Sequence, residues 1–339
     1  YEMSASLVGS EMCIRDRGDT VVRKSYDKDI TFKIIDIKDT DKGSIYILNG
    51  VNLRIVADAP LEDLEQIDED SLGVTDIVFN RKVNESIKNI INSRNISKNT
   101  KRYKSNRDRK NAKDNRETKS KRNSRGSETA KNYNRDLKKI KITTIDNSDS
   151  MVFSRPGKIL HVDGDATYLE VCIKVYKQLS INVVGKVIPE SKQPEEIVNI
   201  VKEVKPDIVV ITGHDGVAKG VKDYFDLNNY RNSKYFVDSV SRLRDYEPNY
   251  DDLVIYAGAC QSCYEAILDA GANYASSPER VLIHCLDPVF VCQKVAYTNI
   301  NDIVNIREAV TNTITGAKGV GGLQTRGKCR EGYPRSTFF

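Results

Sequence analysis

The second half of the chain alternates between short apolar runs and amphipathic stretches. Runs such as GKILHVD, INVVGKVI, DIVVITG and DLVIYAG have the length of buried strands, and each precedes a segment with apolar residues at helical spacing, such as YLEVCIKVYKQL or SKYFVDSVSRLRDY. Strands that alternate with helices predict a parallel sheet with helices on both faces. We therefore expect an α/β domain over residues 151–336, in which RVLIHC is the fifth strand.

The first part of the chain has a different texture. Over residues 18–67 the runs TVVRKS, ITFKIIDI, SIYILN and LRIVA alternate polar and apolar positions and are broken by Asp, Gly and Asn. This pattern predicts four or five short strands, which favours a small SH3-like β-barrel. Such a barrel either docks a partner or serves as a structural cap, and the sequence leaves both interpretations open.

Residues 68–150 hold a weak helical pattern followed by a strongly basic segment. Residues 101–140 contain 16 Lys or Arg and 5 Asp or Glu, a net charge of +11, whereas the whole chain carries +5. Because the segment has almost no apolar residues, it predicts a disordered, solvated linker. Attachment to a polyanion is the alternative, but without regular aromatic residues we expect no specific recognition of nucleic acid.

The first residues look foreign to the rest. Residues 7–17, LVGSEMCIRDR, match the translation of a sequencing-library adapter, so we expect residues 1–17 to be an artefact and exclude Cys13 from the argument. No signal peptide and no apolar run of about 18 residues is present, which predicts a cytoplasmic protein without a membrane span. Its seven cysteines are then expected to be free thiols.

Chemistry-bearing residues follow two of the predicted strands. His214 comes after DIVVITG, and Cys260 comes after DLVIYAG. Parallel strands bring their carboxyl ends to one edge of the sheet, where ligands bind. A cysteine nucleophile needs a thiolate, which an imidazole and a helix N-terminus favour. We predict Cys260 as nucleophile at the start of a helix, His214 as its acid–base partner, and backbone N–H groups near Asp215 and Gly216 as an oxyanion site.

The first predicted strand also ends in polar residues. ILHVDGD places His161, Asp163 and Asp165 at the same sheet edge, where we expect them to assist catalysis or to shape the substrate pocket. For His161 the alternative is a hydrogen-bonded histidine at a strand end. His284 lies among apolar residues and is interpreted as a core histidine.

Cys263, one helical turn after Cys260, admits other interpretations. A C-x-x-C pair that opens a helix can be a redox motif, and a metal site could recruit both cysteines with His284 and Cys285. We favour a Cys263 that packs inside, with Cys172, Cys285 and Cys292 as small apolar core residues. No metal or organic cofactor is expected.

These motifs carry two resemblances. The ITGHDG and AGAC elements resemble the caspase, clostripain and legumain superfamily of cysteine peptidases, although H-D-G stands here where that superfamily has H-G. Six ordered blocks, including LRIVADAPLEDL, ILHVDGDATYL, AGACQSCYEA and GAKGVGGLQTRGKCREGYPRS, resemble the YabG family of sporulation-specific proteases.

The resemblance implies a caspase-like or flavodoxin-like parallel sheet after the barrel, and a cysteine protease that trims spore coat and cortex-associated proteins. His214 and Cys260 would be its catalytic pair, and the mother-cell cytoplasm at the forming coat its location. In the superfamily the loop after the first strand lines the pocket for the residue before the scissile bond, so Asp163 and Asp165 would favour Arg or Lys there. Cleavage within the basic linker would follow.

A second class of function remains open. The α/β domain could be a non-enzymatic, flavodoxin-like binding module, with the barrel docking on a spore-assembly scaffold. Replacement of Cys260 would then have no effect.

Overall fold

The computed structural model describes residues 16–41, 43–67, 73, 75–94 and 151–336. The predictions for residues 1–15 and for the basic segment 101–140 lie outside these residues. The chain forms two compact units, one of residues 1–86 with 156–330 and one of residues 87–155 with 331–339. The N-terminal sheet and the parallel sheet therefore belong to the same unit.

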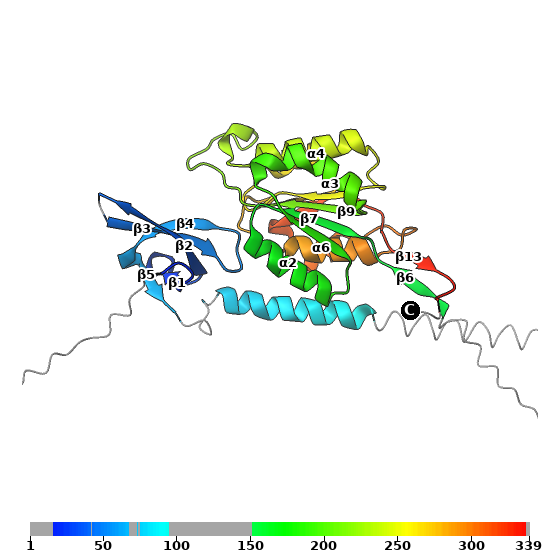
Figure 1. Ribbon diagram of the computed structural model, residues 1–339, viewed down its shortest axis with the longest axis horizontal. Helices are drawn as coiled ribbons and strands as arrows, with labels where there is room; N and C mark the ends of the chain where they lie inside the picture. The colour runs from blue at the N-terminus through cyan, green and yellow to red at the C-terminus, as the bar shows by residue number, and fades with distance from the viewer. Residues whose placement is uncertain (1–15, 42, 68–72, 74, 95–150, 337–339) are drawn as a thin grey trace, which may run out of the picture. The chain divides into compact units, whose positions relative to one another are not determined.

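A six-stranded sheet forms the centre of the α/β region (Figure 1). Its order is β12-β11-β10-β9-β7-β8, and all neighbours are parallel except β12, which pairs antiparallel with β11. The first strand in the chain thus lies between the second and the third, as in flavodoxin-like sheets, and the strand order reverses between β7 and β9. The strands are β7 (Ile159–Asp163), β8 (Val183–Val187), β9 (Ile208–Thr212), β10 (Val254–Ala257), β11 (Tyr274–Ser276) and β12 (Val320–Gly322).

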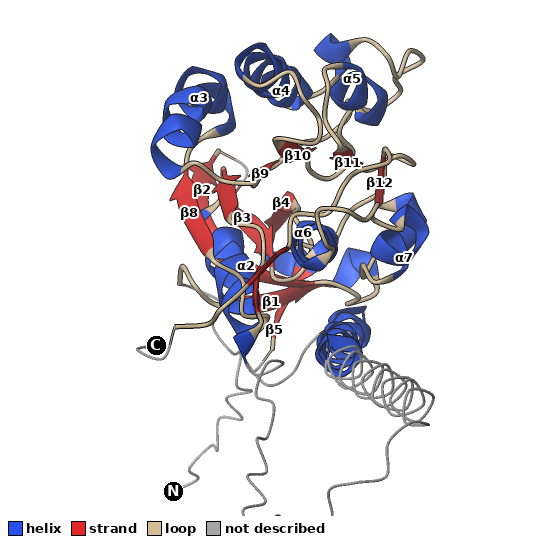
Figure 2. Ribbon diagram, turned by 90° about the vertical axis from the view of Figure 1, so that its right-hand side faces the viewer, coloured by secondary structure: helices blue, strands red, loops and turns tan. Residues whose placement is uncertain are grey.

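Helices cover both faces of this sheet, as the alternating pattern predicts (Figures 1 and 2). One layer holds α3 (Gln193–Val204), α4 (Ser233–Tyr246) and α5 (Tyr264–Asp269), and the other holds α2 (Ala166–Gln178), α6 (Asp287–Tyr297) and α7 (Ile306–Thr311). Successive residues of a strand point to opposite faces of the sheet, so they contact the two helix layers in turn. Leu160 and Val162 pack toward α3 and α4, whereas His161 contacts Tyr176 of α2.

One strand prediction is wrong. RVLIHC is not a strand of the sheet; the fifth strand is β11, from the preceding segment NYAS. Ser277 (φ 64°) and Arg280 (φ 54°) adopt left-handed conformations that turn the chain away from the sheet. Residues 281–285 are largely buried instead as a loop, in which His284 forms an isolated antiparallel bridge with Leu53.

The N-terminal strands form an antiparallel sheet of order β4-β3-β2-β1-β5. Among the described strands β4 does not pair with β5, so the expected closed SH3-like barrel is not confirmed. Val21, Phe32, Ile34 and Leu48 form its core. The strands are β1 (Thr20–Arg23), β2 (Thr31–Thr40), β3 (Gly43–Gly50), β4 (Val56–Pro60) and β5 (Leu64–Gln66).

The remaining elements are short or include residues of the second unit. A helix covers residues 75–94, and β6 (Phe153–Arg155) pairs with β13 (Arg330–Gly332). In the described part of the chain, no helix combines the length and the apolarity that a membrane crossing requires. Single 3-10 turns occur at η1 (Lys24–Tyr26), η2 (Leu61–Asp63), η4 (Glu190–Lys192), η5 (Leu227–Asn229) and η6 (Gly316–Lys318).

Candidate active site

His214 and Cys260 follow neighbouring strands in equivalent positions. β9 and β10 pair in parallel from Ile208 opposite Val254 to Ile211 opposite Ala257, a constant offset of 46 residues. The same 46 residues separate His214 from Cys260. The pairing therefore leads both side chains to the same edge of the sheet, beside the switch point where flavodoxin-like folds bind ligands.

The loops that carry these two residues are tied together. Gly258 has φ +108°, a conformation that other L-residues rarely adopt, and lets the chain leave β10 in a sharp turn. Asp215 Oδ2 accepts the Ser262 hydroxyl at 2.8 Å, which joins the loop after β9 to the loop after β10. The expectation that Cys260 begins a helix is wrong, because α5 begins at Tyr264. Cys260 lies in the turn before it.

The His214 imidazole is held from one side. Its Nε2 lies 3.0 Å from Asp165 Oδ2, whereas its Nδ1 is buried without a hydrogen-bond partner. The His214 backbone N–H donates to Glu190 Oε1 at 2.6 Å. When Nε2 carries the proton toward the carboxylate, Nδ1 is left with a lone pair, which is the form that a general base needs.

Asp165 connects His214 to the N-terminal sheet. Its carboxylate caps α2 by accepting the N–H groups of Thr167 and Tyr168, and it also accepts the Asn49 amide at 3.0 Å. Burial would raise the pKa of Asp165, but the hydrogen bond and charge of His214, together with the helix N–H groups, lower it below its ordinary value. The carboxylate is therefore ionised at neutral pH.

Cys260 is protonated in this arrangement. Its side chain is almost fully buried, and its Sγ accepts the Ile283 N–H at 3.2 Å. Burial raises the pKa of the Cys260 thiol to about 11, even though that N–H group and the charge of Arg54 act in the opposite direction. Within the described residues, no hydrogen bond joins Cys260 Sγ to His214, whose Nε2 faces Asp165.

Cys263 lies in different surroundings. Its Sγ is 3.7 Å from the Tyr224 carbonyl oxygen, and its backbone N–H donates to the Ser233 hydroxyl. Both cysteines are free thiols. Cys263 is fully buried where α5 begins and shares none of the hydrogen-bond partners of Cys260.

A buried ion pair lies behind the site. Arg54 Nη1 is 2.7 Å from Asp163 Oδ2, and both side chains are fully buried. Burial would raise the pKa of Asp163, but the Arg54 guanidinium holds it well below its usual range. His161 Nε2 and Asp163 share the Thr212 hydroxyl at 2.8 Å each. Burial lowers the pKa of His161, so its ring is neutral.

Asp215 and Gly216 have their own hydrogen bonds. The Gly216 N–H donates to Asp215 Oδ1 at 2.9 Å, and the Asp215 carboxylate also accepts the Ser233 hydroxyl and the Asn232 N–H. Burial raises the pKa of Asp215, while these donors partly offset the rise. The predicted oxyanion role of this segment is untested by these contacts and stays a prediction.

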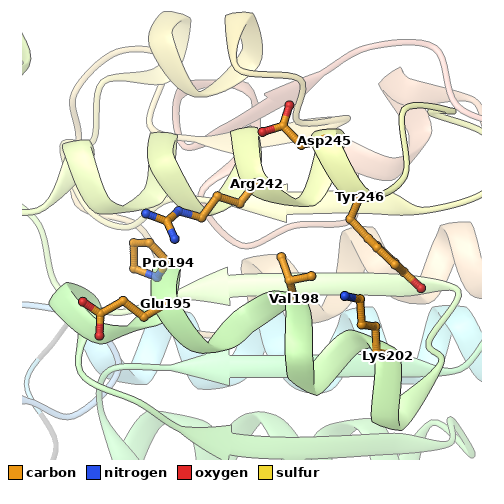
Figure 3. Close-up of a pocket in the computed structure, with 7 residues that line it drawn as sticks. All are labelled: Pro194, Glu195, Val198, Lys202, Arg242, Asp245 and Tyr246. Carbon is orange, nitrogen blue, oxygen red and sulfur yellow. The ribbon is translucent and has the colours of Figure 1, made fainter.

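A cavity of about 680 Å³ opens at the site. It is lined from the α/β region by His214, Asp215, Gly216 and Gln261, and from the N-terminal sheet by residues 54–56. Figure 3 shows a smaller groove of about 370 Å³ between α3 and α4, where Lys202 and Tyr246 lie side by side. That groove contains none of the predicted site residues.

Four residues at the site were missed by the sequence analysis: Asn49, Arg54, Tyr168 and Glu190. Asn49 and Arg54 belong to a segment assigned to a separate barrel, and a pattern of strands gives no sign of which sheet contacts which. Glu190 packs against Gly164 and Gly213, where a Cβ would overlap it. The glycines beside both strand ends are the only signal in the sequence for this carboxylate.

The alternative metal set is not assembled as a cluster. His284 is buried, its Nδ1 accepts the Leu286 N–H, and burial lowers its pKa to about 3. Phe79 packs edge-on against its ring. Among the residues whose positions are described, no group of three or more His, Cys, Asp or Glu is arranged to hold a metal ion.

Comparison with known proteins gives the family. The family model described as "YabG peptidase U57" matches residues 16–334 of this chain. The chain belongs to the YabG peptidase family. It is 38% identical over 320 residues to the sporulation-specific protease YabG of Bacillus subtilis (strain 168), covering 94% of this chain and 97% of that protein. Among solved structures, the REC domain of RcsB from Salmonella enterica serovar Typhimurium is 16% identical, with a TM-score of 0.23, over 35% of this chain and 74% of that one.

Proposed function

We propose that this member of the YabG family is a cysteine endopeptidase of sporulation in which Cys260 is the nucleophile and His214 the acid–base residue. The observation that carries the proposal is the common 46-residue offset, which leads both residues to one sheet edge. The imidazole supports it further, because Asp165 holds Nε2 and leaves the buried Nδ1 without a partner. A free imidazole nitrogen after one strand and a cysteine after the neighbouring strand are the two groups that a nucleophile and its base require.

The reaction is acyl transfer through a thioester. Cys260 gives its proton to His214 Nδ1, and Sγ attacks the scissile carbonyl carbon. The carbon–nitrogen bond breaks, the amine leaves with the proton from His214, and the acyl group stays on sulfur. Water then attacks the thioester while His214 takes its proton, which releases the carboxylate product and restores the thiol. Backbone N–H groups of the 215–216 segment and of Cys260 are proposed to stabilise the oxyanion.

The residue before the scissile bond is proposed to be Arg or Lys. Asp163 is an ionised carboxylate at the bottom of the site, and in the structure a guanidinium already lies against it. A planar guanidinium pairs well with a carboxylate in a dry pocket. Asp165, which is bonded to His214 and Asn49, is a positioning residue rather than part of that pocket.

The biological setting is proposed from the relative. The relative, which matches this chain over nearly its full length, is named as a sporulation-specific protease. From that name we propose spore coat and cortex-associated proteins as substrates. Action in the mother-cell cytoplasm at the forming coat, and recruitment by the N-terminal sheet to an assembly scaffold, are further parts of the proposal. Preference for Arg or Lys would also expose the chain's own basic segment 101–140 to cleavage.

The test is cleavage of a spore coat protein mixture by wild type and by three variants: Cys260→Ala, His214→Ala and Cys263→Ala. Product termini are read by mass spectrometry. We expect the first two variants to be inactive and Cys263→Ala to cleave, with Arg or Lys before each new terminus. Full activity of Cys260→Ala would mean that another group is the nucleophile, whereas no cleavage by wild type would favour the non-enzymatic binding module. Intact wild-type chain after long incubation would argue against cleavage in the segment 101–140.

A further inference from the structure

A loop of the N-terminal sheet contacts the α/β region much as a peptide substrate would. Residues 50–55 run from the last residue of β3 to the start of β4, and the Arg54 side chain among them is fully buried against Asp163. The guanidinium also lies over the Tyr168 ring, with its centre 5.0 Å from the ring centroid. An arginine in an acidic, aromatic-walled pocket is what the proposed specificity requires of a substrate.

The main chain of this loop pairs like an added strand. The Cys285 N–H donates to the Asn52 carbonyl oxygen at 3.0 Å, and Leu53 forms an antiparallel bridge with His284. Extended peptides commonly bind by such backbone pairing to an exposed edge, while a side chain enters a specificity pocket. Residues 283–285 also contact Cys260, because the Ile283 N–H donates to its Sγ. The loop therefore lies along residues 283–285, which contact the proposed nucleophile.

The loop is closed on itself in a way that disfavours its own cleavage. The Ile55 N–H donates to the Leu53 carbonyl oxygen at 2.8 Å, and the Gly50 N–H donates to the Ile55 carbonyl oxygen at 2.9 Å. Gly50 must be glycine, because a Cβ would overlap the Leu53 carbonyl oxygen. The Tyr168 hydroxyl, 2.7 Å from that same oxygen, holds the turn from the other side. The Arg54–Ile55 bond is thus bent into a tight turn rather than presented in extended form.

We infer that the loop 50–55 is an intramolecular substrate mimic, which occupies the peptide-binding cleft with Arg54 in the pocket of Asp163 and keeps the protease inactive until the loop moves. This inference rests on the proposed function. It accounts for the near-complete burial of Cys260 and for the lack of a hydrogen bond from its Sγ to His214 among the described residues. It also names the cleft: the edge 283–285 takes the residues before the scissile bond, and the chain leaves past the 680 Å³ cavity lined by Ile55 and Val56.

The first experiment removes the occupant. Full-length wild type, Arg54→Ala and Cys260→Ala are assayed on the peptide Asn-Leu-Arg bearing a fluorogenic amide. Freeing the site raises the fraction of competent enzyme, so we expect Arg54→Ala to cleave about tenfold faster than wild type at low substrate concentration. The matched control is Arg23→Ala, which removes an arginine of the same sheet that pairs with Asp63, and its rate should equal that of wild type.

The second experiment keeps Arg54 in place, because its loss leaves the buried Asp163 unpaired and can prevent folding. The double variant Leu53→Cys with His284→Cys joins the bridged positions by a disulfide. We expect cleavage by the double variant to stop on oxidation and to return on reduction. Each single variant is compared with its own reduced form, and oxidation should remove no larger a fraction of its rate than it removes from wild type.

The outcomes separate this inference from the proposed function. If Cys260→Ala cleaves the peptide as well as wild type does, the proposed function fails. If Cys260→Ala is inactive but folded Arg54→Ala is no faster than wild type, or the oxidised double variant remains fully active, the loop does not block the cleft and the inference alone is overturned.

Discussion

The hydrogen-bond partner of His214 in this structure is a carboxylate and not the thiol, since Nε2 lies 3.0 Å from Asp165 Oδ2. The ionised carboxylate fixes the orientation of the ring, which the proposed mechanism requires. We expect Asp165→Asn to lower kcat/KM by about 10²-fold. Because the variant lacks an ionised carboxylate, the ratio of the wild-type rate to the variant rate in the pH–rate profile should shrink as acid protonates Asp165 below pH 3.8, which a purely structural role would not cause.

The control for this variant is Asp226→Asn, the same change at an exposed carboxylate that caps η5. It should leave the profile as in wild type. Asn retains the capping function of Asp165 at the start of α2, whereas Asp165→Ala removes it as well and should cost about 1 kcal/mol more in the free energy of unfolding. A normal profile in Asp165→Asn would mean that the carboxylate is only a helix cap.

Asp165 should also make stability depend on acid. Burial raises its pKa, but His214 and the helix N–H groups lower it further, so that the folded value lies below the ordinary 3.8. The interactions then contribute stability above pH 3.8 that is lost as pH falls toward the folded pKa. The midpoint of thermal unfolding should therefore fall more steeply below pH 4 in wild type than in Asp165→Asn. Parallel curves for the two proteins would contradict this.

The resting thiol should be unreactive. Burial raises the pKa of Cys260 to about 11, from an ordinary value of 9.0. Near neutral pH, a thiol with this pKa holds about 100-fold less thiolate than an ordinary cysteine does. We expect iodoacetamide to label Cys260 far more slowly in the native protein than in the chain unfolded in urea, with a rate that still rises at pH 10. Mass spectrometry of the Cys260 peptide measures this, and labelling at the rate of the unfolded chain at pH 7.5 would be inconsistent with the structure.

Two glycines near the site offer a matched pair. Gly258 has φ +108°, and a Cβ there would lie 3.2 Å from Ser276 Cβ, so Gly258→Ala should lose about 1–3 kcal/mol of stability. Gly216→Ala meets only the Gln261 side chain at 3.6 Å and should be close to neutral for folding. Chemical denaturation compares them, and equal midpoints would refute the strained turn before Cys260.

His161 should be structural. Its buried ring is neutral and bonded to Thr212, with Tyr176 packed edge-on against it. We expect His161→Gln to lower the midpoint of thermal unfolding while leaving the shape of the pH–rate profile unchanged. A profile that loses one of its limbs would instead assign the ring a direct part in proton transfer.

Much of the α/β region could be predicted from the sequence, because β7 to β10 and the longer helices each have an apolar pattern of their own. The same pattern misassigned RVLIHC: an apolar run predicts burial, but not whether the partner is a sheet or a loop such as 50–55. β12 was missed because VGG has almost no side chains with which to signal a strand.

The candidate pair followed from strand ends, which are local features. Its surroundings did not, because Asn49 and Arg54 reach Asp165 and Asp163 across more than 100 residues of chain. Such contacts depend on how two sheets pack, and single-sequence periodicity carries no information about that.

The ion pair between Arg54 and Asp163 also limits how this enzyme could be altered. If one carboxylate both selects the substrate and retains the blocking loop, then replacing Asp163 to accept a different residue would release the loop at the same time. A redesigned protease of this family would need a compensating change at Arg54, or it would act before its proper time. The two positions should therefore be varied together in any library that aims at new specificity.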